Sequence, residues 1–258
     1  DKIVYYREVA KDLKINFVFF YIKKNKKKTS VTNILYGQNE NEINLFVSSI
    51  KTNYPNCNII QCSDLDSPQI KGTDLIFREN IDINKIMEGR IFSYSKLNLK
   101  NTSVYLDSDM LLVRKIPFEL FIDKADVFLL KRSFNLDARL PKLFRGQIYE
   151  DHLKGTLGNI YPYIGCFIIS KNNKFWKDCL KIYKRFNNNY KFWFGDQKVL
   201  REIVEMNLYN FAFLNESDFA CPPQFINQNK QPYLIHFKGK IYKTLIKEYY
   251  DHIYIRNI

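Results

Sequence analysis

The stretch Ser103–Ile116 reads Ser-Val-Tyr-Leu-Asp-Ser-Asp-Met-Leu-Leu-Val-Arg-Lys-Ile and sets two carboxylates, Asp107 and Asp109, between apolar runs. A continuous apolar run is typical of a buried strand in a parallel sheet, and ligands of open α/β sheets bind beyond the carboxyl ends of such strands. Side chains alternate along a strand, so residues two apart point to the same side. We therefore expect both carboxylates to face a crevice at a strand end.

Two carboxylates this close repel each other and need a cation or a shared proton. Mg²⁺, and similarly Mn²⁺, is usually held by one or two carboxylates together with substrate phosphates. A solvated turn that merely ends a strand is the alternative interpretation of an Asp-x-Asp tripeptide. The apolar flanks favour the metal site.

The segment Tyr105–Leu111, followed by Ile116-Pro117 and by Glu119-Leu120-Phe121, resembles the metal-binding DxD segment of GT-A-fold glycosyltransferases. It is most similar to that of glycosyltransferase family 8, the glycogenin and lipopolysaccharide galactosyl- and glucosyltransferase group. The resemblance implies an α/β fold with a mostly parallel twisted sheet flanked by helices. It also implies that Asp107 and Asp109 hold Mn²⁺ or Mg²⁺ against the diphosphate of a nucleotide sugar, with UDP as the expected nucleotide and Ser108 beside it.

The chain has 258 residues, of which 46% are hydrophobic and 16% aromatic, which is typical of a folded globular protein. We expect a single GT-A domain over residues 1–258, with residues 1–30 as an N-terminal extension and residues 244–258 as a C-terminal tail. No apolar run approaches the length of a membrane span. The five cysteines show no Cys-x-x-Cys spacing, which argues against a zinc site and a disulfide framework, so we expect a cytoplasmic protein.

The formal net charge of +13 indicates an anionic partner. Nucleic acid is the first candidate partner for a chain with such an excess of positive charge. The lysines are scattered rather than aligned with stacking aromatic residues, however, so we expect no nucleic-acid partner. A nucleotide sugar and an acidic membrane surface fit the charge as well. The basic run at residues 23–28 and the C-terminal tail are the candidates for peripheral membrane contact, and a solvated loop is the alternative for the basic run.

The first nucleotide-binding unit is expected where a strand, a glycine, a polar loop, a helix and a second strand follow one another. Val31–Tyr36 is predicted to be the first core strand, Glu42–Lys51 the helix and Asn58–Cys62 the next strand. In GT-A enzymes this strand end cradles the base and ribose, which implies contacts from Tyr36, Gly37 and Asn39. An ordinary strand–helix turn remains the alternative. Upstream, Ile15–Ile22 is predicted to be a strand or a buried helix end.

The predicted helix Asn84–Leu97 precedes the DxD strand much as an Arg-Leu-x-Leu segment does in family 8, where the arginine contacts the donor. This chain has Lys96 at the matching position. A lysine keeps the cation but loses the bidentate fork of arginine. Arg90 is therefore a competing candidate for the same role.

Two later segments also resemble the family. Tyr163-Ile164-Gly165 resembles an Asn-x-Gly strand whose small residue leaves room for the sugar, with Tyr163 in place of the asparagine. Asp196-Gln197 resembles an Asp-Gln-x-x-Leu segment, which implies that Asp196 contacts the sugar and that Gln197 sits beneath the anomeric carbon. A helix N-terminus, where an acid meets the helix dipole, is the alternative role of Asp196.

Between these segments, Ser133–Gly158 is polar and glycine-punctuated, and a loop of this length is typical of a lid or binding loop. In this fold the region shapes the acceptor site, which makes Arg139, Arg145 and His152 candidates to face the acceptor.

Residues 232–240 are predicted to contain an apolar strand that ends in one histidine, His236. A neutral imidazole is a suitable third ligand for Mn²⁺, and His236 with Gly239 matches the family's His-x-x-Gly. Lysines beside a glycine suit a diphosphate. Lys238, Lys240 and Lys243 are the candidates for that contact.

The resemblance as a whole implies a metal-dependent transferase that moves a sugar from a UDP-sugar to a glycan, lipid-linked or protein acceptor with retention of anomeric configuration, as in polysaccharide biosynthesis. A nucleotidyltransferase acting on sugar phosphates is an alternative, but no glycine-rich, lysine-bearing phosphate loop lies near the first predicted strand. A non-catalytic nucleic-acid-binding domain would explain the charge, but it leaves the acidic pair unexplained.

Overall fold

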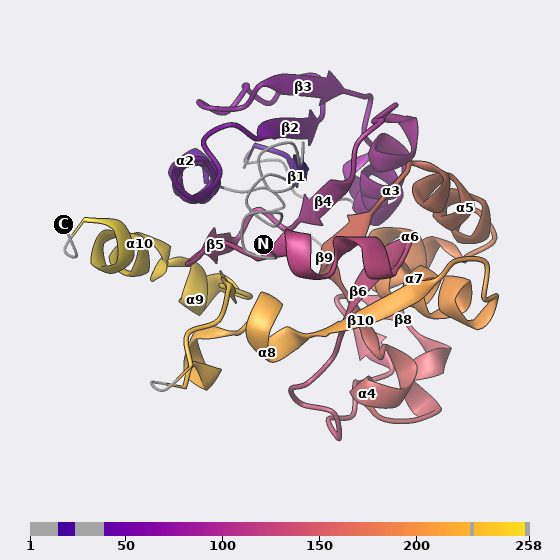
Figure 1. Ribbon diagram of the computed structural model, residues 1–258. Coiled ribbons are helices and arrows are strands. Elements are labelled where there is room, and N and C mark those ends of the chain that lie inside the picture. Colours follow the sequence, from indigo (N-terminus) through magenta and orange to yellow (C-terminus); the bar gives the residue numbers. More distant parts are fainter. Residues whose placement is uncertain (1–14, 24–38, 228–229, 256–258) are drawn as a thin grey trace.

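A central sheet of seven strands runs through the part of the chain that the computed structural model describes, namely residues 15–23, 39–227 and 230–255 (Figure 1). All neighbouring strands in it are parallel except that β9 is antiparallel to both of its neighbours. The mostly parallel sheet predicted from the sequence is thereby confirmed. In spatial order the strands are β10 (Phe211–Asn215), β6 (Val127–Lys131), β9 (Tyr163–Ser170), β4 (Ser103–Leu106), β1 (Asn16–Tyr21), β2 (Asn58–Ser63) and β3 (Leu75–Arg78).

Strand β1 is in the middle of this sheet, between β4 and β2, and all six of its residues are buried. Its apolar residues alternate between two packed faces, which is why this run forms a strand and not a helix end. The prediction that residues 1–30 are an extension is therefore wrong for residues 16–21. Strand β2 is parallel to both of its neighbours, β1 and β3, and β1 precedes the first described helix, at residues 40–53. The predicted strand Val31–Tyr36, and with it Tyr36 and Gly37, lies outside the described residues.

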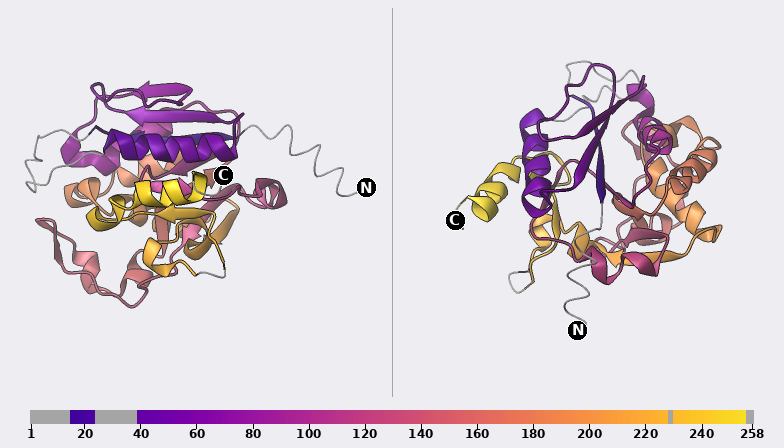
Figure 2. Two further views of the ribbon diagram at one scale, coloured as in Figure 1. Left: turned by 90° about the vertical axis from the view of Figure 1, so that its left-hand side faces the viewer. Right: turned by 45° about the horizontal axis from the view of Figure 1, so that its top comes forward.

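Helices cover both faces of the sheet, as Figure 2 shows. On one face, α2 (Glu40–Asn53) packs against alternate strand residues such as Phe17 and Phe19. On the other face, α3 (Ile86–Lys96), α5 (Lys174–Tyr183) and α7 (Gly195–Glu205) pack against the intervening residues, among them Val18 and Phe20. Helix α10 (Ile246–Tyr254) lies against α2.

The predicted helices Glu42–Lys51 and Asn84–Leu97 agree with α2 and α3 to within a few residues, and the predicted strand Asn58–Cys62 agrees with β2. Helix α2 begins after Asn39, whose side chain accepts a hydrogen bond from the backbone of Asn41, and acidic residues fill its first turn. Shorter helices connect the larger elements: α4 (Leu157–Ile160), α6 (Asn188–Phe192), α8 (Glu216–Phe219), α9 (Lys240–Lys243) and the 3-10 helices η1 (Ile83–Lys85), η2 (Phe118–Leu120), η3 (Ile122–Lys124), η4 (Glu150–Leu153) and η5 (Pro223–Phe225). None of the described helices is both long and apolar enough to cross a bilayer.

The stretch Ser103–Ile116 is not one continuous strand. It breaks at Asp107–Asp109, and β5 (Met110–Leu112) leaves the large sheet to pair with β11 (Leu234–His236). The pairing is antiparallel and sets His236 opposite Met110. The buried hydroxyl of Ser49 on α2 accepts a hydrogen bond from the backbone of Leu112 at 3.1 Å, which ties β5 to that helix. This break brings the C-terminal part of the chain to the carboxyl end of β4.

The region predicted to be a long loop, Ser133–Gly158, contains local structure. Strands β7 (Leu143–Phe144) and β8 (Gln147–Ile148) form a small hairpin, followed by η4 and the start of α4. A cluster of buried aromatic residues, including Tyr149 and Tyr161, packs this region against Phe194 at the start of α7. The region is thereby attached to the helix that carries Asp196 and Gln197.

Candidate functional site

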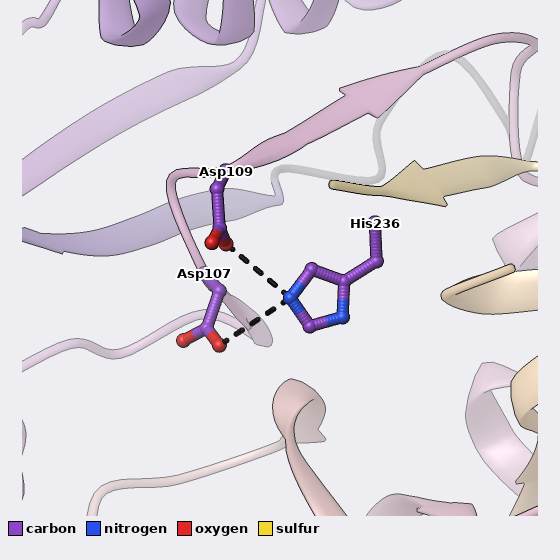
Figure 3. Close-up of side chains that lie close together, drawn as sticks. All are labelled: Asp107, Asp109 and His236. Carbon is purple, nitrogen blue, oxygen red and sulfur yellow. Dashed lines mark ion pairs between the residues drawn. The ribbon is translucent and has the colours of Figure 1, made fainter. Parts of the chain in front are cut away.

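Asp107, Asp109 and His236 converge at the carboxyl end of β4, as Figure 3 shows. The Nε2 atom of His236 lies 3.3 Å from Oδ1 of Asp109 and 4.0 Å from Oδ2 of Asp107. One ligand atom from each side chain can be chosen so that all three lie within 4.8 Å of one another. Two carboxylate oxygens and an imidazole nitrogen at this spacing fit a divalent cation such as Mn²⁺ or Mg²⁺.

Backbone hydrogen bonds fix these three residues in place. The amide of Asp107 donates to the carbonyl of Cys166 on β9 at 2.9 Å, and the carbonyl of Asp109 accepts from the amide of Phe237 at 2.8 Å. His236 in turn donates its amide to the carbonyl of Cys221 at 3.0 Å. Ser108 between the two acids is buried and donates its hydroxyl to the carbonyl of Phe20 at 3.4 Å. The turn that presents the carboxylates is therefore held by several elements at once.

The two carboxyl groups have pKa values that are shifted in opposite directions by their surroundings. Burial and the neighbouring Asp109 raise the pKa of Asp107 above its ordinary value, although Arg90 and His236 oppose the shift. For Asp109, burial also raises the pKa, but the charges of His236 and Lys243 outweigh it and the pKa falls well below its ordinary value. Burial lowers the pKa of His236, and Cys166 and Asp109 raise it by more. Two carboxylates in mutual repulsion are the environment that a bound cation relieves.

Arg90 on α3 links the acidic pair to α7. Its Nη1 atom lies 2.7 Å from Oδ1 of Asp107, and its Nη2 atom lies 2.5 Å from Oδ2 of Asp196. Lys96, the other cation considered from the sequence, is exposed at the end of α3 with its Nζ atom 5.1 Å from the centre of the Phe92 ring. Of the two candidates, Arg90 is the one in contact with the acidic side chains.

Gly165 on β9 lies directly against the ion pair between Arg90 and Asp196. A Cβ atom at this position would be 2.7 Å from Oδ2 of Asp196 and 3.3 Å from Nη2 of Arg90. The family resemblance implies that this glycine leaves room for the sugar. In the structure the space that it leaves is filled by the Arg90–Asp196 ion pair.

Asp196 and Gln197 lie in the first turn of α7, where the chain makes a tight entry. Phe194 has a left-handed backbone with φ 61°, and a Cβ on Gly195 would be 2.1 Å from the carbonyl oxygen of Tyr190. The side chain of Gln197 accepts a hydrogen bond from Nη2 of Arg132 at 2.6 Å. Arg132 was not among the residues predicted from the sequence. Its position at the carboxyl end of β6 was the signal that could have identified it, because the ends of parallel strands meet at one edge of a sheet.

The other predicted binding residues have these positions. Asn39 is the N-cap of α2, and Tyr163 stacks on Phe213 with ring centroids 5.1 Å apart. Lys238 and Gly239 are exposed, and Gly239 has a φ of 94°. Lys243 on α9 reaches the site, with Nζ 2.9 Å from Oδ2 of Asp109.

The three residues considered for the acceptor differ in their surroundings. His152 is buried, with Nδ1 2.7 Å from the carbonyl oxygen of Pro141 and Nε2 3.2 Å from the hydroxyl of Tyr161. The guanidinium of Arg145 lies 3.9 Å from the centre of the Trp193 ring, and Arg139 is exposed. His152 therefore has the contacts of a structural residue.

The sequence matches no protein-family model and no curated protein. Solved structures show the fold. The galactosyltransferase LgtC, solved in complex with donor and acceptor sugar analogues, has a TM-score of 0.54 at 10% identity over 93% of this chain and 96% of LgtC. The glycosyltransferase GlyE of Streptococcus pneumoniae has a TM-score of 0.57 at 14% identity over 93% of this chain and 60% of GlyE.

A protein of Bacillus anthracis described as a glucose-1-phosphate thymidylyltransferase has a TM-score of 0.50 at 10% identity, over 92% of this chain and 95% of that protein. At identities this low the likeness establishes the fold and not the activity. The sheet order, the covering helices and the likeness to LgtC and GlyE together show that the chain has the GT-A fold.

Proposed function

We propose that the protein is a metal-dependent glycosyltransferase that moves a sugar from a nucleoside-diphosphate donor, UDP-linked as the sequence resemblance implies, to a hydroxyl group of an acceptor. The observation that carries the proposal is the convergence of Asp107, Asp109 and His236 at the carboxyl edge of a GT-A sheet. Ligands of open α/β sheets bind at this edge. Two of the solved structures that resemble the chain, LgtC and GlyE, are glycosyltransferases.

Asp107, Asp109 and His236 are the residues that hold the divalent cation in this proposal. A cation bound there neutralises the charge that develops on the departing diphosphate and orients it. Lys243 lies 2.9 Å from Asp109 and supplies a second positive charge at the edge of the cluster, where a phosphate oxygen would lie. Arg90 keeps Asp107 in position from the opposite side.

Asp196 and Gln197 are the residues that we assign to the sugar. The Asp196 carboxylate is linked through Arg90 to Asp107, so the sugar-binding and diphosphate-binding groups form one connected network. Such a network holds both parts of the donor in a fixed relation, which is how positioning lowers the activation barrier. We assign retention of anomeric configuration to the reaction on the family resemblance.

The acceptor in this proposal is a glycan, a lipid-linked glycan or a protein, and it approaches over the region 133–158. That region is packed against the start of α7 through Phe194, so it lies next to Asp196 and Gln197 in space. Contact with an acidic membrane surface through the basic residues of the chain is a further part of the proposal.

The test is a transfer assay with UDP-glucose and UDP-galactose in the presence of Mn²⁺. UDP release is measured with and without a panel of neutral, lipid-linked and peptide acceptors, and the anomeric configuration of the product is determined by NMR. We expect UDP release that stops with EDTA and returns with Mn²⁺, and a product with the configuration of the donor. Inversion would contradict the family assignment, and release of pyrophosphate from UTP with a sugar phosphate would identify a nucleotidyltransferase instead.

A further inference from the structure

Arg132 is a buried cation that the proposed chemistry has not used. It follows β6, is 7% exposed, and donates from Nε to the carbonyl of Tyr161 at 3.0 Å. Its Nη2 atom donates to Oε1 of Gln197 at 2.6 Å. The buried carboxylate of Glu216 accepts hydrogen bonds from the backbone amides of Ser133 and Phe134, next to Arg132, and supplies a negative charge nearby. Two hydrogen bonds, to Tyr161 and to Gln197, therefore fix the orientation of the guanidinium beside the charge of Glu216.

The hydrogen bond from Arg132 to Gln197 determines which way the side-chain amide of Gln197 faces. A guanidinium carries only hydrogen-bond donors, whereas an amide carries a donor end and an acceptor end. The two ends of an amide are hard to tell apart by shape alone, and the hydrogen-bond network decides between them. Because Arg132 can only donate, Oε1 of Gln197 must face Arg132. The two hydrogens on Nε2 are then the groups that Gln197 offers to a ligand.

We propose that Arg132 is a positioning residue that holds the amide oxygen of Gln197, so that Gln197 acts on the substrate as a hydrogen-bond donor through Nε2. This inference rests on the proposed function, because it assigns the way in which Gln197 serves sugar transfer. Arg90 fixes Asp196 in the same manner from α3. Two arginines from different elements thus fix the two consecutive side chains at the start of α7.

Substitution of Gln197 separates the donor role from a role of the amide oxygen. Glutamate has the same shape as glutamine, keeps an oxygen toward Arg132, and replaces the two N–H donors with a second oxygen. We expect Gln197→Glu to lower kcat as severely as Gln197→Ala, by on the order of 100-fold, because loss of one preorganised donor has effects of this size. UDP affinity in Mn²⁺ stays unchanged in both variants. A Gln197→Glu variant that keeps wild-type kcat would overturn the proposal.

Substitution of Arg132 tests the positioning role itself. We expect Arg132→Met to lower kcat about as much as Gln197→Ala and to add no further loss in the Gln197→Ala background, since both changes disable the same group. Arg132→Lys keeps the charge but lacks the planar fork that holds the amide, so it shows the same loss and serves if Arg132→Met does not fold. The matched control is Arg201→Met on α7, the helix that carries Gln197, because Arg201 is exposed and pairs with Glu205. Independent, multiplying losses for Arg132→Met and Gln197→Ala would overturn the proposal.

A second readout does not depend on activity. Denaturant unfolding of the two single variants and the double variant gives the coupling between Arg132 and Gln197. We expect a coupling of about tenfold in the unfolding equilibrium constant, the size of a hydrogen bond to a charged group. Additive effects would show that the contact is absent and overturn the inference. If the wild-type protein transfers no sugar while the coupling is present, it is the proposed function that fails.

Discussion

The substitution Gly165→Ala adds one methyl group at the point where Arg90 meets Asp196. The new Cβ would be 2.7 Å from Oδ2 of Asp196, which is closer than real Cβ atoms approach an oxygen. Gly165 is not one of the described glycines that have a positive φ. Alanine at this position therefore adds a steric conflict and no backbone strain. The Asp196 carboxylate must move, and its 2.5 Å contact with Arg90 is lost.

The expected size of the effect follows from the exposure of the two side chains. Arg90 is 11% and Asp196 15% exposed, so solvent compensates little for the lost contact. A hydrogen bond to a charged group in such surroundings contributes about 1.5–3 kcal/mol. For a chain of this length a loss of about 2 kcal/mol lowers Tm by about 4–8 °C. Displacement of Asp196 also lowers kcat, by on the order of 100-fold if the shift approaches 1 Å.

Thermal unfolding and the transfer assay measure both effects. Gly155→Ala is the matched control, because a Cβ there meets its nearest neighbour at 3.5 Å, an ordinary contact. In an Asp196→Ala background the clash with the carboxylate is gone, so Gly165→Ala should lower Tm by much less. A Gly165→Ala protein with the Tm and kcat of the wild type, or a Tm loss that is the same in both backgrounds, would refute the reasoning.

Three further predictions follow from the structure. Asp109→Ala removes a ligand of the proposed cation site, so metal-dependent sugar transfer is lost while the far-UV circular dichroism of the fold remains. Lys243→Ala weakens binding of UDP in the presence of Mn²⁺ about tenfold in isothermal titration calorimetry, because one charge-assisted contact is removed. Burial raises the pKa of Asp178, but hydrogen bonds from Tyr209, Lys174 and Lys181 lower it by more, so the carboxylate stabilises the fold above about pH 4 and this contribution is lost as the pH falls further. Asp178→Asn therefore lowers the free energy of unfolding at pH 7, and its difference from the wild type shrinks below about pH 4 in denaturant titrations.

Each of these predictions has a control and a contrary outcome. Asp123→Ala removes an exposed acid and should leave transfer intact, and full activity in Asp109→Ala would remove the basis for the metal site. Lys247→Ala, on an exposed ion pair of α10, should leave UDP binding unchanged. A Lys243→Ala protein that binds UDP like the wild type would exclude Lys243 from the phosphate contact. A stability difference for Asp178→Asn that stays constant from pH 7 to pH 3 would contradict the assignment of a charged Asp178.

The fold class and several elements were predictable from the sequence because their signals are local. The apolar run before Asp107 and the amphipathic pattern of α2 each identify an element without knowledge of its neighbours. Strand β1 was harder to assign, because the apolar run Phe17–Tyr21 fits a buried helix end as well as a strand. The parallel pairing with β2 and β4, which decides the question, joins residues far apart in the chain.

The candidate site was predictable where a short motif carries the chemistry. Asp107, Asp109 and His236 were singled out from their residue types and surroundings, and the structure brings them together. The acids after Leu106 indicated a strand end, but the departure of β5 from the large sheet was not predictable, because it depends on pairing with β11, which lies far along the chain. Arg132 was missed for a similar reason. An arginine after a strand is ordinary until Gln197, 65 residues later, is seen to accept its hydrogen bond.

The measurement that tests the central claim most directly is a thermal-shift titration with UDP, GDP, CDP and ADP, each with and without Mn²⁺, on the wild type and on Asp109→Ala. The account predicts that UDP stabilises the wild type only when Mn²⁺ is present, by about 2.7 kcal/mol at a concentration 100 times its Kd, and that Asp109→Ala shows no such shift. A folded wild-type protein that none of the four diphosphates stabilises in Mn²⁺ would contradict it.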